Sequence, residues 1–72
     1  MKTQKIILEI LEDFMGDFVA PGELYREAQI AGYVGKQEKL LKTADEMAKE
    51  RVIISRRRGI EQNNWYRLPS QN

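Results

Sequence analysis

Apolar side chains in residues 1–51 recur three and four positions apart, the spacing of amphipathic α-helices. The firmest run lies near the start of the chain and consists of Ile6, Ile7, Ile10, Leu11 and Phe14. We expect Thr3 to cap this first helix at its N-terminus and Gly16-Asp17 to end it. The pattern therefore predicts a helix over roughly the first fifteen residues.

Two further helices are predicted. Pro21 suits the first position of the second helix, after a short extended segment at 18–19, and its apolar positions are Leu24, Tyr25 and Ala28. The third is expected at about 36–51, with apolar positions Leu40, Leu41, Ala44, Met47 and Ala48. A brief turn at 32–35, with glycine at both ends, separates them, which is the spacing of a helix-turn-helix.

After residue 51 the pattern changes to β-branched and aromatic residues, which favour strands. Segments 51–59 and 63–68 are expected to pair as a β-hairpin with arginines at its tip. The favoured pairing turns four side chains toward the helices: Val52, Ile54, Tyr66 and Leu68. Trp65 is then expected to face outward beside the arginines, and residues 69–72 to form a frayed tail.

Helix, short strand, helix, turn, helix and hairpin, in this order, resembles the winged helix-turn-helix family of DNA-binding domains. The segments that carry the resemblance are 20–24, 32–35, 40–47, and 52–59 through 66–68. It spans nearly the whole chain and implies one α+β domain over 1–72, with three helices and a C-terminal two-stranded β-hairpin, the wing. In that family the third helix enters the major groove and the wing lies on the backbone or in the minor groove.

The charge of the chain is unevenly distributed. Residues 1–34 hold three basic and six acidic side chains, whereas residues 35–72 hold nine and five, so the halves carry net charges of −3 and +4. Such asymmetry indicates an anionic partner for the second half if folding gathers its charges on one surface. A mixed, solvated surface is the alternative.

The composition excludes several kinds of chemistry. The chain has no Cys and no His, which excludes disulfides, zinc fingers and imidazole bases. The neighbouring carboxylates of Glu12 and Asp13 have no nucleophile or metal ligand to work with, so we expect no enzyme activity, no cofactor and no metal. Because no apolar run approaches the roughly 20 residues of a membrane span, and no secretory signal is evident, we expect a soluble cytoplasmic protein.

The first half of the third helix carries the candidate base contacts, because helix-turn-helix proteins read bases from that end. Glutamine can pair with adenine, lysine can donate to guanine, and a threonine methyl can meet that of thymine. The candidates are Lys36, Gln37, Lys39, Lys42 and Thr43. Acidic residues also lie on this helix, so the alternative is a solvated surface with charge pairs such as Glu38 with Lys42.

The wing carries a cluster of three arginines, Arg56, Arg57 and Arg58. Because alternate strand residues point to opposite faces, Arg56 and Arg58 are expected on one face and Arg57 on the other. The cluster suits phosphate or a narrow minor groove. Its alternative is a charged edge strand that discourages aggregation. Trp65 either stacks on sugar or base or covers the flank of the core.

The apolar surface of the first helix is wider than one core requires. It indicates either a dimer seam along Leu8, Leu11 and Met15 or a central helix that touches all its neighbours. The function expected from these features is sequence-specific binding of double-stranded DNA by a homodimeric transcription regulator that acts by operator occupancy. The alternative is a winged-helix protein-interaction module or inhibitor subunit. The sequence leaves open whether the nucleic acid is DNA or RNA.

Overall fold

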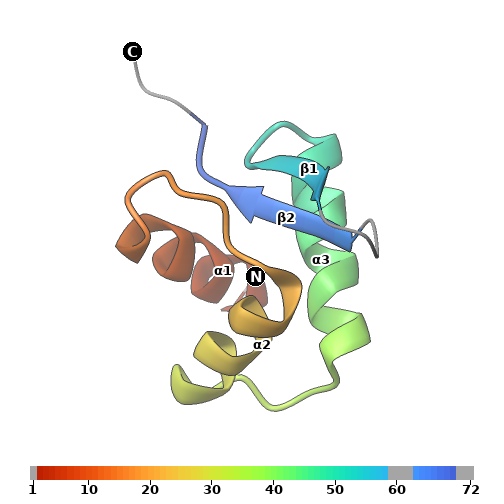
Figure 1. The fold of residues 1–72 in the computed structure, drawn as a ribbon. Helices are drawn as coiled ribbons and strands as arrows, with labels where there is room; N and C mark the ends of the chain where they lie inside the picture. Colours follow the sequence, from red (N-terminus) through yellow and green to blue (C-terminus); the bar gives the residue numbers. More distant parts are fainter. Residues whose placement is uncertain (1, 59–62, 70–72) are drawn as a thin grey trace.

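The computed structural model describes residues 2–58 and 63–69, with the backbone alone for Arg58 and Asn63. Its elements are α1 (Lys2–Asp13), α2 (Pro21–Ile30), α3 (Gln37–Lys49), β1 (Ile54–Arg58) and β2 (Asn63–Arg67). The two strands form an antiparallel hairpin that follows the helices (Figure 1). This α+β layout confirms the predicted fold class and is consistent with a winged helix. Gly59, at the end of the first predicted hairpin segment, and the tail at 70–72 lie outside the described residues.

The core forms where the three helices meet the hairpin. The apolar positions predicted for the helices are buried there, including Ile7, Leu24, Leu40 and Met47, and the hairpin adds Tyr66. No polar side chain is among the buried residues of the described chain. The helical periodicity of the sequence therefore identified the faces that pack together.

The helix ends differ from the prediction in detail. Thr3 lies inside α1, which begins at Lys2, so its assignment as an N-cap is wrong. Pro21 opens α2 as predicted. Lys36 is the N-cap of α3 and makes no side-chain capping bond, so it stands at the edge of the helix rather than within it.

The extended segment before α2 joins the sheet. The Val19 N–H donates to the Tyr66 carbonyl at 2.7 Å, and the Tyr66 N–H donates to the Val19 carbonyl at 3.1 Å. Figure 1 shows this segment beside β2. The predicted short strand is thus present as a single bridge that connects the α1–α2 loop to the wing.

The chain leaves α3 through a left-handed residue. Arg51 has a φ of 63°, its N–H donates to the Ala48 carbonyl at 3.0 Å, and the Val52 N–H donates to the Met47 carbonyl at 2.9 Å. This pair of bonds is the Schellman motif, which usually places glycine where Arg51 stands. Residues 52–53 therefore belong to the helix exit and not to the strand.

This exit overturns part of the predicted hairpin pairing. Val52 is 42% exposed and Ile53 only 1% exposed, so Ile53 and not Val52 enters the core. Ile54 pairs with Arg67 on the face opposite Tyr66, so its inward assignment is also wrong. Tyr66 is buried as predicted, and Leu68 packs against the core.

Candidate nucleic-acid interface

The start of α3 presents most of its predicted contact residues to solvent. Lys36, Gln37, Lys39 and Lys42 are all exposed. Thr43 is half-buried, and its hydroxyl donates to the Lys39 carbonyl at 3.2 Å. That bond uses the hydroxyl hydrogen of Thr43 within the helix.

The hairpin register divides the arginines between two faces. Ser55 pairs with Tyr66, and Arg57 pairs with Asn64. These four residues form the face of the hairpin on which Tyr66 is buried, which we call the inner face. Arg56 pairs with Trp65 on the opposite side. Arg57 therefore shares the side of α3, whereas Arg56 points away from it. The Arg58 backbone continues β1, and its side chain lies outside the described residues.

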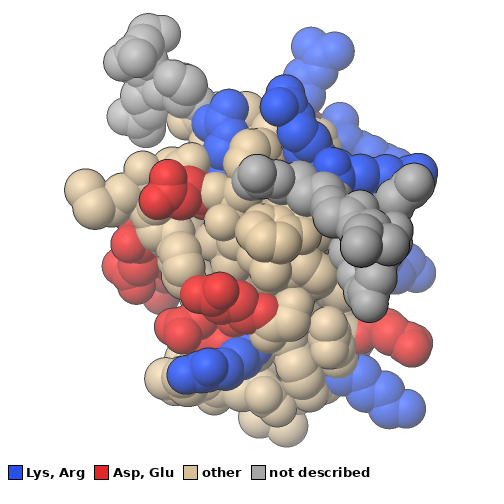
Figure 2. Space-filling model, in the orientation of Figure 1, with Lys and Arg blue, Asp and Glu red and all other residues tan. Residues whose placement is uncertain are grey.

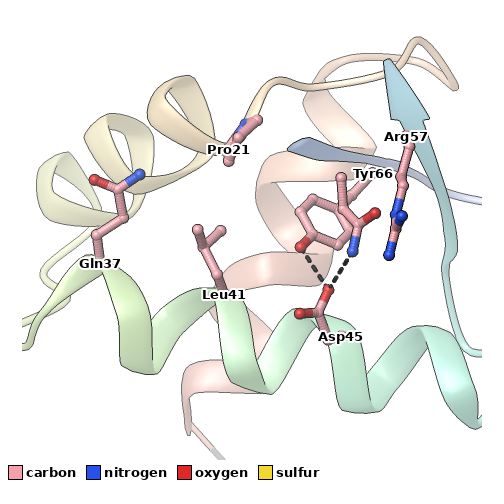
Figure 3. A pocket seen from close by; sticks show the side chains of 7 residues that line it. Pro21, Gln37, Leu41, Asp45, Arg57 and Tyr66 are labelled. Carbon is pink, nitrogen blue, oxygen red and sulfur yellow. Dashed lines mark hydrogen bonds between the residues drawn. The ribbon is translucent and has the colours of Figure 1, made fainter. Parts of the chain in front are cut away.

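A cleft of about 310 Å³ separates α3 from the inner face of the hairpin and the start of α2 (Figure 3). Its lining consists of Pro21, Gln37, Leu41, Asp45, Arg57, Asn64 and Tyr66. Figure 3 shows the Arg57 side chain reaching down from β1 toward α3. The cleft thus brings together Gln37 from the predicted helix contacts and Arg57 from the predicted wing contacts.

Asp45 ties the hairpin to α3 at the floor of this cleft. The Tyr66 hydroxyl donates to its Oδ1 at 2.6 Å and the Asn64 amide donates to the same oxygen at 3.2 Å (Figure 3). Burial raises the pKa of the Tyr66 hydroxyl above its usual value, and the bond to Asp45 raises this pKa further. The two bonds fix the position of β2, and with it the paired Arg57, relative to α3.

Sequence reasoning missed this connection. The sequence identifies Asp45 only as one of the acidic residues of the third helix, and Asn64 only as part of the second segment of the predicted hairpin. A signal was present, since Asp45 lies one helical turn after Leu41 and so on the same side of α3. Only the hairpin register shows that Asn64 and Tyr66 face it.

Aromatic and guanidinium groups meet on the other side of the hairpin. The guanidinium carbon of Arg67 lies 5.2 Å from the centre of the Phe18 ring and that of Arg56 lies 5.9 Å from it. Arg67 also donates from Nη1 to the Leu68 carbonyl at 3.0 Å. The sequence had given Phe18 only a strand position, because nothing in the pattern placed it next to the wing.

The residues of the predicted dimer seam lie in three different environments. Leu11 is fully buried in the core of a single chain, so its assignment to a surface seam is corrected. Leu8 is half-buried against that core, and Met15 is 89% exposed. Dimerisation therefore stays a prediction that concerns Met15 and the edge of Leu8.

Charge is separated in space as well as in sequence. On the face shown in Figure 2, basic side chains gather over the hairpin and α3, and acidic side chains gather mainly over α1 and α2. Arg56 and Arg57 are exposed parts of the basic side. On this face the basic side chains of the hairpin therefore lie together.

Comparisons with family models, curated proteins and solved structures gave no match. No helix in the described part of the chain is long and apolar enough to cross a membrane. Among the described residues, no group of three or more Asp or Glu side chains is arranged to hold a metal ion.

Proposed function

We propose that this protein binds double-stranded DNA, with α3 in the major groove and the hairpin against the neighbouring backbone. The observation that carries the proposal is that the exposed guanidinium of Arg57 stands beside α3, across the cleft from Gln37. A helix with exposed polar residues at its start and a cation held next to it matches what a groove and its flanking phosphates require.

The roles divide by position. Gln37, Lys39 and Lys42 are exposed on α3 and have side chains that can donate to the base edges of the major groove. Lys36, at the N-cap, stands where the chain enters the helix and suits a phosphate contact. Arg57 contacts phosphate from the wing. Because phosphate contacts position a protein and base contacts specify the site, both sets are needed for sequence-specific binding.

The bonds of Asp45 give one acidic residue of α3 a structural role. The helix also carries Glu38 and Glu46. The Asp45 carboxylate accepts bonds from Tyr66 and Asn64, at the floor of the cleft. One of the acidic residues of α3 therefore serves to hold the wing in place.

A regulator of this kind would act by occupying its operator. If the protein forms a symmetric homodimer, its two α3 helices would enter successive major grooves about 34 Å apart on a palindromic site. The separation of acidic and basic sides favours this orientation, since it steers the basic side toward the DNA.

The test is binding of a mixed-sequence duplex across a salt series, measured by fluorescence anisotropy. We expect the logarithm of the affinity to fall linearly with that of the salt concentration, by about 0.9 per phosphate contact. Arg57→Ala should lower the affinity and flatten the slope by about one contact. Lys5→Ala, an exposed charge on α1, is the matched control and should change neither. Absence of binding at low salt would refute the proposal.

A second candidate function is a protein-interaction module. Its support is the exposure of two large apolar side chains near the helix-turn-helix, Ile30 at 72% and Val34 at 97%. Single exposed apolar residues are common on soluble proteins, so this support is weaker than the charge and geometry of α3 and the wing. If the protein is an interaction module, Ile30→Asp should abolish binding of its protein partner, whereas Arg57→Ala should leave that binding unchanged.

A further inference from the structure

We propose that the outer face of the hairpin is a second binding surface, one that takes single-stranded nucleic acid. The outer face consists of Phe18, Ile54, Arg56, Trp65 and Arg67. It lies on the side of the sheet opposite Tyr66 and the cleft. The inference therefore does not depend on the proposed function, which uses α3 and Arg57.

The backbone register assembles this face. Arg56 is paired with Trp65, and Ile54 with Arg67, so all four side chains leave the hairpin on one side. Val19 bridges to Tyr66 and is buried, so its neighbour Phe18 turns the other way, toward the arginines. A loop residue thus completes a surface made by two strands.

Phe18 holds two cations near one ring. Arg67 and Arg56 lie 5.2 Å and 5.9 Å from the ring centre, within the range of a cation–π contact. A guanidinium that lies over a ring keeps its N–H donors at its edge for phosphate oxygens. Within residues 2–58 and 63–69 neither guanidinium has a carboxylate partner. Two like charges gathered in this way favour an anion between them.

Trp65 provides the reason to expect bases as well as phosphates. Its side chain is half-buried and stands directly opposite Arg56, and such paired residues have Cβ atoms about 5 Å apart. One nucleotide can therefore place its base on the indole and its phosphate on the guanidinium. An unpaired base offers a free face for stacking, whereas the bases of an intact duplex are stacked on each other.

The chain supplies its own reporter, because Trp65 is its one tryptophan. Titration with a short oligothymidylate at low salt should quench the Trp65 fluorescence, since the base stacks on the ring. Inorganic polyphosphate carries the same kind of charge without bases and should leave the fluorescence unchanged. Quenching by polyphosphate to the same extent, or no quenching by oligothymidylate, would overturn the proposal.

Two adjacent arginines provide matched variants. Arg56→Ala on the outer face should weaken oligothymidylate binding by roughly tenfold, and Arg57→Ala on the inner face by about twofold or less, as measured by anisotropy. Trp65→Leu should also weaken it roughly tenfold, the loss of one stacked base. Circular dichroism melts establish that each variant is folded. Equal weakening by Arg56→Ala and Arg57→Ala would mean attraction by charge alone, which would refute the outer face as a site.

The duplex assay separates the two proposals. If both are right, Arg57→Ala weakens duplex binding more than Arg56→Ala does, and the order reverses for oligothymidylate. Failure of duplex binding with intact quenching of Trp65 would remove the proposed function and leave the outer face. Duplex binding without that quenching would do the opposite.

Discussion

At the scale of single residues, Tyr66 combines a core position with a bond to a charged group. Its hydroxyl donates to Asp45 at 2.6 Å, and the residue is only 1% exposed. Hydrogen bonds to charged groups contribute about 1.5–3 kcal/mol, so Tyr66→Phe should destabilise the fold by about 2 kcal/mol at neutral pH. Urea unfolding followed by circular dichroism measures this loss.

The same bond predicts a loss of stability in alkali. Burial and Asp45 raise the pKa of Tyr66 in the folded state, whereas an unfolded tyrosine loses its proton near pH 10. The folded state then holds the proton more tightly, so the contribution of Tyr66 is complete below about pH 10 and decreases as the pH rises through the folded pKa. Above pH 10 the wild type should lose stability more steeply than Tyr66→Phe. Parallel curves would show that the hydroxyl is not held by Asp45.

Arg51 has a backbone conformation that suits glycine. Its φ of 63° is in the left-handed region, which costs a residue with a Cβ about 1–2 kcal/mol. Arg51→Gly removes this cost, but glycine also raises the conformational entropy of the unfolded chain, which opposes folding. We expect a net stabilisation of about 1 kcal/mol in thermal melts. Lys49→Gly, inside the last turn of α3, is the control and should destabilise by up to about 1 kcal/mol. A destabilising Arg51→Gly would contradict the Schellman exit.

At the scale of elements, the exit from α3 decides which residues of the wing are buried. Ile53 is 1% and Val52 42% exposed, the reverse of the pattern read from the sequence. We therefore expect Ile53→Ala to cost about 2–5 kcal/mol and Val52→Ala less than about 0.5 kcal/mol. Denaturant unfolding of the two variants gives a direct comparison. A larger loss from Val52→Ala than from Ile53→Ala would restore the sequence-based pairing.

The order and type of the elements could be predicted because each follows from local patterning. Leu40, Ala44 and Met47 recur at helical spacing, and Pro21 marks the start of α2. The faces of the hairpin could not be predicted, because they depend on where Arg51 ends the helix, and a shift of one residue exchanges inside for outside. The bonds of Asp45 and the contacts of Phe18 could not be predicted either, because both join residues that are far apart in the chain.

At the scale of the whole molecule, the main feature is that the basic side and the predicted dimer seam belong to different elements. The basic side lies over α3 and the hairpin, and the most exposed apolar residue of the predicted dimer seam, Met15, follows α1 in the chain. A dimer formed through Met15 would therefore not use the side chains of α3 that are proposed to contact DNA. This arrangement permits recognition and assembly to be changed independently.

The homodimer can be tested through Met15. A stable interface usually covers about 800 Å² of each partner, more than Met15 and the edge of Leu8 provide alone, so we expect a weak dimer with a Kd in the micromolar range. Met15→Glu should make the protein monomeric in sedimentation equilibrium without changing its melting temperature, because Met15 is 89% exposed. Leu11→Glu is the contrasting variant and should unfold the chain, because Leu11 is fully buried. If the wild type is a monomer at tens of micromolar, the symmetric operator model fails. Duplex binding by a single copy then remains to be judged by the salt series alone.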